Sequence, residues 1–407
     1  MESKMKGKYQ SLSLLEDLKG NEIEKKRVLV RVDFNVPLDE NLNVKDDTRI
    51  RASLDTIKYL LSNNCIVILM SHLGRPKGHV EEKLRMDPVA LSLENILQRR
   101  VIKLDDCIGE DVQKIIFKLN PGEIVLLENL RFHQGEEDND PLFSQQLASL
   151  ADIYVDDAFG AAHRAHASTA GIASYLPAYA GFLMAQEIKS LNRLMFHSDR
   201  PFISIIGGAK VSSKIEILDR LTEISDGVLI GGGMAYTFIA AQGFEIGKSI
   251  YEEDQIKFCK ELMEKAKIME KVFLIPEDVN IAFEFTQDSD SFNVSKEKIE
   301  KNMIGMDIGN RTIESFKKVI SNSKKIFWNG PLGVFEMDKF AKGTNEIARQ
   351  IASLHGKVFS VVGGGDSIAA INKLGLINKF SHISTGGGAS LEYVAGRNLP
   401  GIEVLKK

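Results

Sequence analysis

Two sets of residues in this sequence have the types and spacing needed to bind anions. In the first half of the chain, arginine, histidine, aspartate and asparagine side chains follow four short apolar runs, at Arg31 to Asn35, Ser71 to Pro76, Glu128 to Arg131, and the stretch DDAFGAAHRAH that starts at Asp156. Guanidinium groups bind phosphate and carboxylate oxygens through paired, charge-assisted hydrogen bonds. This half is therefore predicted to hold a small anion with its side chains.

Glycine clusters occupy the equivalent positions of the second half. They lie at Gly207-Gly208, Gly231 to Gly233, Gly363 to Gly365 and Gly386 to Gly388. Glycine lets the backbone approach a ligand closely, and a helix that opens after such a turn directs its N–H groups and its dipole at phosphate. The second half is therefore predicted to bind a nucleotide.

Three charged residues adjoin these clusters. Lys210 and Lys214 are four residues apart, so on a helix they would share a face, either as a phosphate clamp or as ordinary solvated lysines. Asp366 follows three glycines directly and is expected to cap its helix, to hold Mg²⁺, or both.

The elements that must position these residues are short apolar strands separated by longer helical stretches. Strands that are apolar on both faces and alternate with helices are typical of parallel sheets covered on both sides, which bind ligands at the carboxyl ends of their strands. We therefore predict a doubly wound α/β fold. The predicted strands are Val28–Val32, Ile66–Met70, Ile124–Leu127, Ile153–Val155, Phe202–Ile206, Val228–Ile230, Val272–Ile275, Ile326–Trp328 and Val358–Val362.

A predicted helix in the middle of the chain divides it into two halves. Met184, Ile188, Leu191 and Met195 recur at spacings of four, three and four, which places them on one helix face. Since 407 residues exceed the usual size of one domain, we predict that this helix connects two domains. An ordinary helix within one continuous sheet is the alternative.

Composition restricts the class of protein. The 52 basic and 56 acidic residues give a formal charge of −4, which offers no bulk attraction to nucleic acid or to an anionic membrane. We find neither a secretory signal nor 18 consecutive apolar residues, and the three cysteines are far apart and form no CxxC pair. A reducing cytoplasm is predicted. The acidic run Glu136 to Asp140 is predicted to be a solvated loop.

Several familiar motifs are incomplete. GFEIGKS at Gly243 to Ser249 has one residue too few for a P-loop, and none of the triple-glycine clusters completes GxGxxG. His163 and His166 form HxxH without a glutamate or cysteines nearby, so structural or anion-binding roles are favoured over zinc. Trp328 ends an apolar run and is predicted to belong to the core.

Nine segments in order along nearly the whole chain resemble the signatures of phosphoglycerate kinases. They are RVDFNVP from Arg31, SHLGRPKG from Ser71, LLENLRFH from Leu126, DAFGAAHRAHAST from Asp157, GGAKVSSKI from Gly207, GGGMAYTF from Gly231, WNGPLGVFE from Trp328, VGGGDS from Val362 and STGGGASLE from Ser384. Three positions depart from the family pattern: Ser367 replaces the usual threonine, and GMDIGN from Gly305 differs from it at Met306 and Asn310.

The resemblance implies two Rossmann-like doubly wound domains, joined by a central helix, with a cleft between them. The implied ranges are 1–181 for a phosphoglycerate-binding domain on which 393–407 packs back, 182–199 for the helix and 200–392 for a nucleotide-binding domain. The implied protein is a cytoplasmic monomer with no nucleic-acid or membrane partner. It would transfer a phosphoryl group between ATP and the carboxylate of 3-phosphoglycerate, giving ADP and 1,3-bisphosphoglycerate, with Mg²⁺ and after hinge closure.

The resemblance also implies site residues. Matching the phosphoglycerate site are Asp33, Asn35, Arg49, His72, Arg75, Arg131, His163 and Arg164. Matching the nucleotide site are Gly208, Lys214, Gly232, Gly233, Met306, Pro331, Val334, Glu336, Gly364, Gly365, Asp366 and Ser367, with Asp366 toward Mg²⁺. Arg49 and Lys210 are implied to stabilise the transferring group. The alternatives are a non-catalytic metabolite-binding module and a nicotinamide-dependent dehydrogenase, which the missing GxGxxG disfavours.

Overall fold

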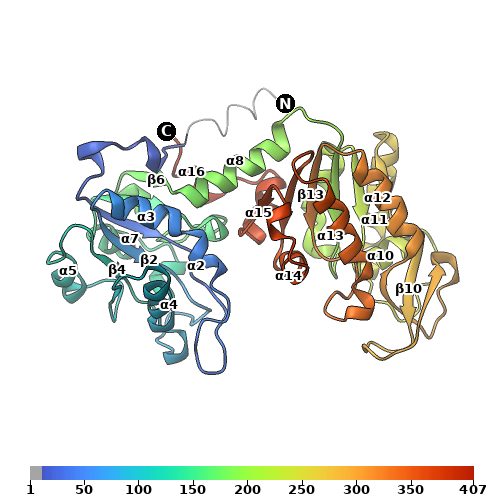
Figure 1. The fold of residues 1–407 in the computed structure, drawn as a ribbon, viewed down its shortest axis with the longest axis horizontal. Coiled ribbons are helices and arrows are strands. Elements are labelled where there is room, and N and C mark those ends of the chain that lie inside the picture. The colour runs from blue at the N-terminus through green and yellow to red at the C-terminus, as the bar shows by residue number, and fades with distance from the viewer. Residues whose placement is uncertain (1–11) are drawn as a thin grey trace. The chain divides into compact units, whose positions relative to one another are not determined.

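The computed structural model describes residues 12–407 and contains two compact units, each built on its own parallel sheet (Figure 1). The N-terminal unit contains the chain up to Lys189 together with Asn398–Lys407, and the C-terminal unit contains Ser190–Arg397. The predicted class, two α/β domains with parallel sheets, is confirmed. The domain ranges implied by the resemblance remain a prediction.

The sheet of the N-terminal unit has six parallel strands in the order β3-β4-β2-β1-β5-β6. All four strands predicted here are present. The two additional strands, of two and three residues, lie at the edges of the sheet and were not predicted. The bounds are β1 Arg27–Arg31, β2 Ile66–Met70, β3 Ile102–Lys103, β4 Ile124–Leu126, β5 Ile153–Asp156 and β6 Ala178–Ala180.

Helices cover both faces of this sheet because its central strands are apolar on both sides. Val28 and Val30 of β1 pack into one buried cluster, whereas Leu29 between them packs into another on the opposite face. The helices are α2 Thr48–Ala52, α3 Leu54–Ser62, α4 Asp87–Leu97, α5 Glu110–Ile116, α6 Gln134–Glu137, α7 Pro141–Ala148 and α16 Pro400–Glu403, with the 3₁₀ helix η5 at Leu130–Phe132.

The C-terminal unit contains a second six-stranded parallel sheet, in the order β15-β14-β13-β7-β8-β9. All five strands predicted here are present, and Trp328 is fully buried in the core, as predicted. The bounds are β7 Phe202–Ile206, β8 Gly227–Ile230, β9 Val272–Leu274, β13 Lys325–Asn329, β14 Phe359–Gly363 and β15 His382–Ile383. The helices are α9 Ile215–Ile224, α10 Met234–Ala241, α11 Ile256–Ile268, α12 Asn310–Ser321, α13 Lys342–Ser353, α14 Gly365–Lys373 and α15 Gly388–Val394.

A small antiparallel sheet also belongs to the C-terminal unit and was not predicted. Its order is β11-β10-β12, with β10 at Asp278–Ala282, β11 at Ser291–Ser295 and β12 at Ile304–Ile308. Its middle strand carries aspartate and asparagine between apolar residues, so it lacks the continuous apolar run used to identify strands.

Helix α8, Phe182–Phe196, begins in the N-terminal unit and continues into the C-terminal unit from Ser190 (Figure 1). The four apolar residues predicted to share one face are all buried. Its start is held by Asp157, whose Oδ1 accepts hydrogen bonds from the backbone N–H groups of Leu183 at 2.9 Å and Met184 at 3.3 Å. Such contacts satisfy N–H groups that have no partner within the helix.

The last residues return to the N-terminal unit. The N–H of Ser13 donates to the carbonyl of Leu405 at 2.8 Å, and Leu12 and Lys406 form an antiparallel bridge. No helix in residues 12–407 has the length and apolar character needed to cross a membrane.

Candidate functional site

A cluster of cationic side chains lies at the carboxyl ends of the strands in the N-terminal unit. Arg31, the last residue of β1, is 1% exposed, and its Nη2 lies 3.1 Å from Nδ1 of His72, which follows β2. The pKa of His72 is held well below its usual value by burial and by the charges of Arg31, Arg131, Arg164 and Arg49. His72 is therefore a neutral imidazole beside four guanidinium groups, a combination suited to an anion with several oxygens.

Hydrogen bonds fix several of the predicted phosphoglycerate residues. Arg49 Nη1 donates to Oδ2 of Asp33 at 2.9 Å and to the carbonyl of Asn35 at 3.2 Å. The loop after β2 joins the same group, because the Gly74 N–H donates to Asn35 Oδ1 at 2.9 Å and the Gly74 carbonyl accepts from Arg131 Nη1 at 2.8 Å. The ends of β1, β2 and β4 are thereby tied together.

The remaining predicted residues of this half-site are less tightly connected. Arg164 Nε lies 3.1 Å from His163 Nε2, on the segment after β5. Arg75 is exposed, and no hydrogen bond in the described part of the chain ties it to the other predicted residues. Arg31 lies within the predicted strand Val28–Val32 but is missing from the predicted site residues. A charged residue inside an apolar run is the signal that identifies it.

Arg31 is also held by two buried residues, Ser168 and Glu136. Its Nε donates to Ser168 Oγ at 2.8 Å, and that hydroxyl donates to Glu136 Oε1 at 2.6 Å. Glu136 is fully buried at the start of the acidic run, so the prediction that this run is a solvated loop is wrong for it. His166 Nδ1 lies 3.7 Å from Glu136 as well, which is a structural role for the second histidine of HxxH.

The C-terminal unit contains a pocket of about 460 Å³ at the carboxyl ends of its parallel strands. Eight of the predicted nucleotide residues line it: Gly208, Gly232, Gly233, Met306, Pro331, Val334, Glu336 and Asp366. Apolar and polar side chains that were not predicted complete the walls, among them Tyr236, Lys248, Ile250, Phe285, Ile304 and Asp307. They are spread over four stretches of chain and are brought together only by the fold.

Two glycines keep this pocket open. Gly232 has φ +67°, and a Cβ there would lie 2.6 Å from the backbone nitrogen of Gly208. Gly305 packs so closely on the buried ring of Tyr236 that a Cβ would overlap it. Substitution at either position would force backbone or a buried ring to move.

Lys214 lies where the strand order of the C-terminal sheet reverses. Its Nζ donates to the carbonyl of Gly207 after β7 and to Oδ1 of Asn329 at the end of β13, both at 2.7 Å. Burial lowers its pKa to about 8, and the charge of Asp366 opposes that shift. Ligands of doubly wound sheets bind at such reversal points.

Lys210, in contrast, is exposed on a turn. Residues 207–211 are not helical, and Lys214 closes a 3₁₀ helix at Ser212–Lys214, so α9 begins only at Ile215. The prediction that the two lysines share a helix face is therefore wrong. The glycines before Lys210 prolong the turn.

Helix α14 begins directly after the third glycine cluster. Gly364 is its N-cap residue with φ +92°, and no side-chain capping bond forms. Of the two roles expected for Asp366, the helix cap is thus not observed; Asp366 lies exposed in the first turn, where a carboxylate interacts favourably with the helix dipole. Ser367 Oγ is buried and accepts the N–H of Gly330 at 2.7 Å, which joins α14 to the loop after β13.

Comparison with known proteins identifies the family. The model described as phosphoglycerate kinase matches residues 15–397. The chain belongs to the phosphoglycerate kinase family. The phosphoglycerate kinases of Moorella thermoacetica and Dictyoglomus turgidum are each 53% identical to it, over 95% and 96% of this chain and 98% of each relative.

Solved structures agree in fold. The phosphoglycerate kinase of Coxiella burnetii aligns with a TM-score of 0.87 at 36% identity, over 97% of this chain and 98% of that one. That of Pyrococcus horikoshii aligns with a TM-score of 0.82 at 33% identity, with the same coverage. As a member of the phosphoglycerate kinase family, the chain is a phosphotransferase with a carboxyl group as acceptor. Neither a non-catalytic binding module nor a dehydrogenase is favoured.

Proposed function

We propose that the chain catalyses reversible, Mg²⁺-dependent phosphoryl transfer between ATP and the carboxylate of 3-phosphoglycerate, giving ADP and 1,3-bisphosphoglycerate. The observation that carries this proposal is the group of arginines around the neutral His72, because 3-phosphoglycerate presents both phosphate and carboxylate oxygens, and guanidinium groups bind both. This group of arginines would bind the phosphoryl acceptor, 3-phosphoglycerate, and the pocket of the C-terminal unit would bind the phosphoryl donor, ATP.

In the N-terminal unit, the arginines are assigned to the phosphate and carboxylate of 3-phosphoglycerate. Asp33 and Asn35 lie beside Arg49 and provide oxygens to which the substrate hydroxyl would donate. His72, His163 and the exposed Arg75 complete the set. Since these groups come from loops after four different strands, the sheet edge fixes their spacing.

In the C-terminal unit, the pocket is assigned to the nucleotide. Gly208, Gly232 and Gly233 would lie under the base, with Met306, Pro331 and Val334 as apolar walls and Glu336 at the ribose. Lys214 and the start of α14, with Gly364, Gly365 and Ser367, would bind the phosphates. These assignments are those that the resemblance to the family implies.

Asp366 is the proposed residue for Mg²⁺. Its carboxylate is exposed, lines the pocket and is close enough to influence Lys214, which fits a hard cation that prefers oxygen ligands and keeps several waters. When bound, the ion would neutralise charge on the nucleotide phosphates.

The reaction needs no nucleophilic side chain and no general base, because the acceptor carboxylate is already ionised. In-line attack then depends on positioning and on charge neutralisation, to which Arg49 and Lys210 are assigned. The two residues belong to different units. We propose that the units close on their substrates before transfer, and that closure excludes water that would otherwise accept the phosphoryl group.

The purified chain can be tested in a coupled assay with 3-phosphoglycerate and ATP·Mg²⁺. Turnover that depends on both substrates and on Mg²⁺ supports the proposal, and a folded chain without turnover contradicts it. Small-angle scattering tests closure, since the radius of gyration should fall only with both substrates present. We also propose that the chain is a cytoplasmic monomer, and mass measurement in solution tests its oligomeric state.

A further inference from the structure

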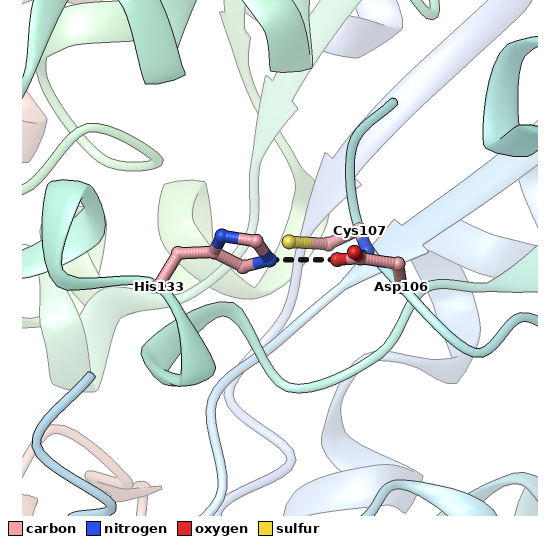
Figure 2. A group of neighbouring side chains, drawn as sticks. All are labelled: Asp106, Cys107 and His133. Carbon is pink, nitrogen blue, oxygen red and sulfur yellow. Dashed lines mark hydrogen bonds and ion pairs between the residues drawn. The ribbon is translucent and has the colours of Figure 1, made fainter. Parts of the chain in front are cut away.

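A compact group of three potential metal ligands lies in the N-terminal unit, and nothing in the proposed reaction uses it. Figure 2 shows Asp106, Cys107 and His133 facing one another. The ligand atoms of the three side chains all lie within 4.8 Å of one another. Asp106 and Cys107 lie between β3 and α5, and His133 lies between η5 and α6, so the ends of the neighbouring strands β3 and β4 bring them together.

Hydrogen bonds and packing already orient two of these ligands. Asp106 Oδ1 lies 2.7 Å from Nε2 of His133 and accepts the backbone N–H of Cys107 at 2.7 Å. The His133 ring packs on Phe143, with the ring centroids 5.3 Å apart. Orientation by such neighbours is what metal-binding histidines require.

The exposure of these side chains to solvent would also allow an ion to reach them. The side chains of His133 and Asp106 are 32% and 50% exposed, whereas Cys107 is fully buried behind them. Burial keeps the pKa of the Cys107 thiol well above its usual value, so the thiol by itself is not a reactive nucleophile or redox centre. The arrangement therefore places a soft sulfur ligand on the buried side of the group, and a nitrogen and an oxygen ligand on its exposed side.

We propose that Asp106, Cys107 and His133 bind a thiophilic divalent cation of the zinc type, with water as the fourth ligand. Ligand atoms in a tetrahedral zinc site are about 3.3–3.6 Å apart. Asp106 Oδ1 and His133 Nε2, now 2.7 Å apart, must therefore open by about 0.6–0.9 Å, and any pair near the 4.8 Å limit must close by about 1 Å. The ion takes the place of the hydrogen bond between Asp106 and His133. The thiol releases one proton to solvent as its sulfur coordinates, and no change of oxidation state is involved.

The chemistry separates this site from the proposed Mg²⁺ site. Mg²⁺ prefers oxygen ligands, whereas sulfur and imidazole nitrogen select zinc, and cobalt as its spectroscopic substitute. A millimolar excess of Mg²⁺ should therefore leave the proposed site free for the softer ion. The two cysteines outside the site, Cys65 and Cys259, are also buried and unpaired, and neither belongs to such a group in the described residues.

The test is a titration of the untagged chain with Co²⁺ in excess Mg²⁺, without nucleotide or phosphoglycerate, so that its result is independent of the proposed function. One cobalt ion per chain should produce a thiolate-to-cobalt absorption band in the near ultraviolet, and Zn²⁺ should displace it. Cys107→Ala should abolish the band, and the matched Cys65→Ala should retain it. His133→Asn and Asp106→Asn should weaken binding by about tenfold or more.

The remaining outcomes decide against the site. A band that persists in Cys107→Ala, a band lost equally in Cys65→Ala, or no band in the unchanged chain overturns the proposal. Thermal unfolding without metal shows which variants are folded. If Cys107→Ala is not folded, the test relies on the variants of the partly exposed residues, His133→Asn and Asp106→Asn. Unchanged cobalt affinity in both variants also overturns the proposal.

Discussion

The ammonium of Lys214 donates a 2.7 Å hydrogen bond to Oδ1 of Asn329, across the reversal in strand order between β7 and β13. A second bond reaches the carbonyl of Gly207. The amine therefore lies partly buried beside neutral oxygens, and this desolvation is why its pKa falls to about 8. Its charge is present at neutral pH and is lost under mildly alkaline conditions.

Nucleotide affinity should consequently fall as pH rises through about 8. Only the protonated amine attracts phosphate, so we expect a loss of about tenfold between pH 7 and pH 9. Calorimetric titration of ADP across this range measures it. Lys214→Met should remove the loss, whereas Lys210→Met, on the exposed turn, should retain it; a pH-independent affinity in the unchanged chain would contradict the assignment.

The arginines of the N-terminal unit should act on one substrate only. Arg75→Ala or Arg164→Ala should raise the KM for 3-phosphoglycerate, since each removes charge-assisted bonds of about 1.5–3 kcal/mol formed in ground and transition states alike. Steady-state kinetics with each substrate varied measures the effect. Arg100→Ala, an exposed arginine of the same unit, is the control. Equal changes in the KM for ATP would show that these arginines are not confined to the phosphoglycerate half-site.

Asp366 should act through the metal ion. Asp366→Asn should lower turnover and weaken binding of Mg·ADP, while metal-free ADP should bind almost as before, because the carboxylate contacts the nucleotide only through Mg²⁺. The affinity for ADP, measured once with Mg²⁺ and once with a chelator, distinguishes the effect on Mg·ADP from the effect on metal-free ADP. Asp254→Asn, an exposed aspartate of the same unit, serves as the control. An equal loss with and without Mg²⁺ would assign Asp366 a structural role instead.

Arg49 and Lys210 are assigned to the group in transfer, so their removal should affect turnover. Arg49→Ala and Lys210→Ala should each lower kcat by roughly 10²–10⁵ with modest change in either KM, the range for loss of a transition-state charge partner. Single-turnover kinetics isolates the chemical step. Lys248→Ala, an exposed lysine that lines the nucleotide pocket, is the comparison. A change confined to KM would place the charge in substrate binding only.

The buried carboxyl of Asp157 should make stability depend on pH. Burial raises its pKa from 3.8 to about 7, so between these values the folded state binds more protons than the unfolded state. Its contribution to the free energy of unfolding is therefore fully present below pH 3.8 and is lost as pH rises from there through about 7. Urea unfolding of Asp157→Asn should show a weaker decline between pH 5 and pH 7.5 than the unchanged chain does. An identical decline in both would show that other groups cause it.

The parallel strands could be predicted because they consist of consecutive apolar residues, which indicate that both faces of a strand are buried. Ile66–Met70 is apolar at every position, and both faces of the strand pack against helices. The antiparallel strand at Asp278–Ala282 was missed because Asp278 and Asn280 interrupt the pattern, and contacts with Asn293 and Thr312, distant in sequence, satisfy the aspartate. Edge strands of two or three residues leave no periodicity to detect.

The same limit applies to the site. Glycine clusters and arginines after strands could be predicted to lie at the carboxyl ends of the two sheets, since both are features of the local sequence. The burial of Glu136 depends on Ser168, and the contact between Gly305 and Tyr236 depends on two separate elements of the fold. Such contacts join segments that are distant in sequence, so neither segment alone predicts them.

The return of Asn398–Lys407 to the N-terminal unit has a consequence for biosynthesis. The C-terminal unit is one continuous segment that can begin to fold as soon as Arg397 has left the ribosome. The N-terminal unit lacks its closing strand contact, between Leu12 and Lys406, until translation reaches the last residues. A chain that ends at Arg397 should therefore hold a complete C-terminal unit beside an N-terminal unit that is still open to proteolysis, even though the N-terminal residues are made first.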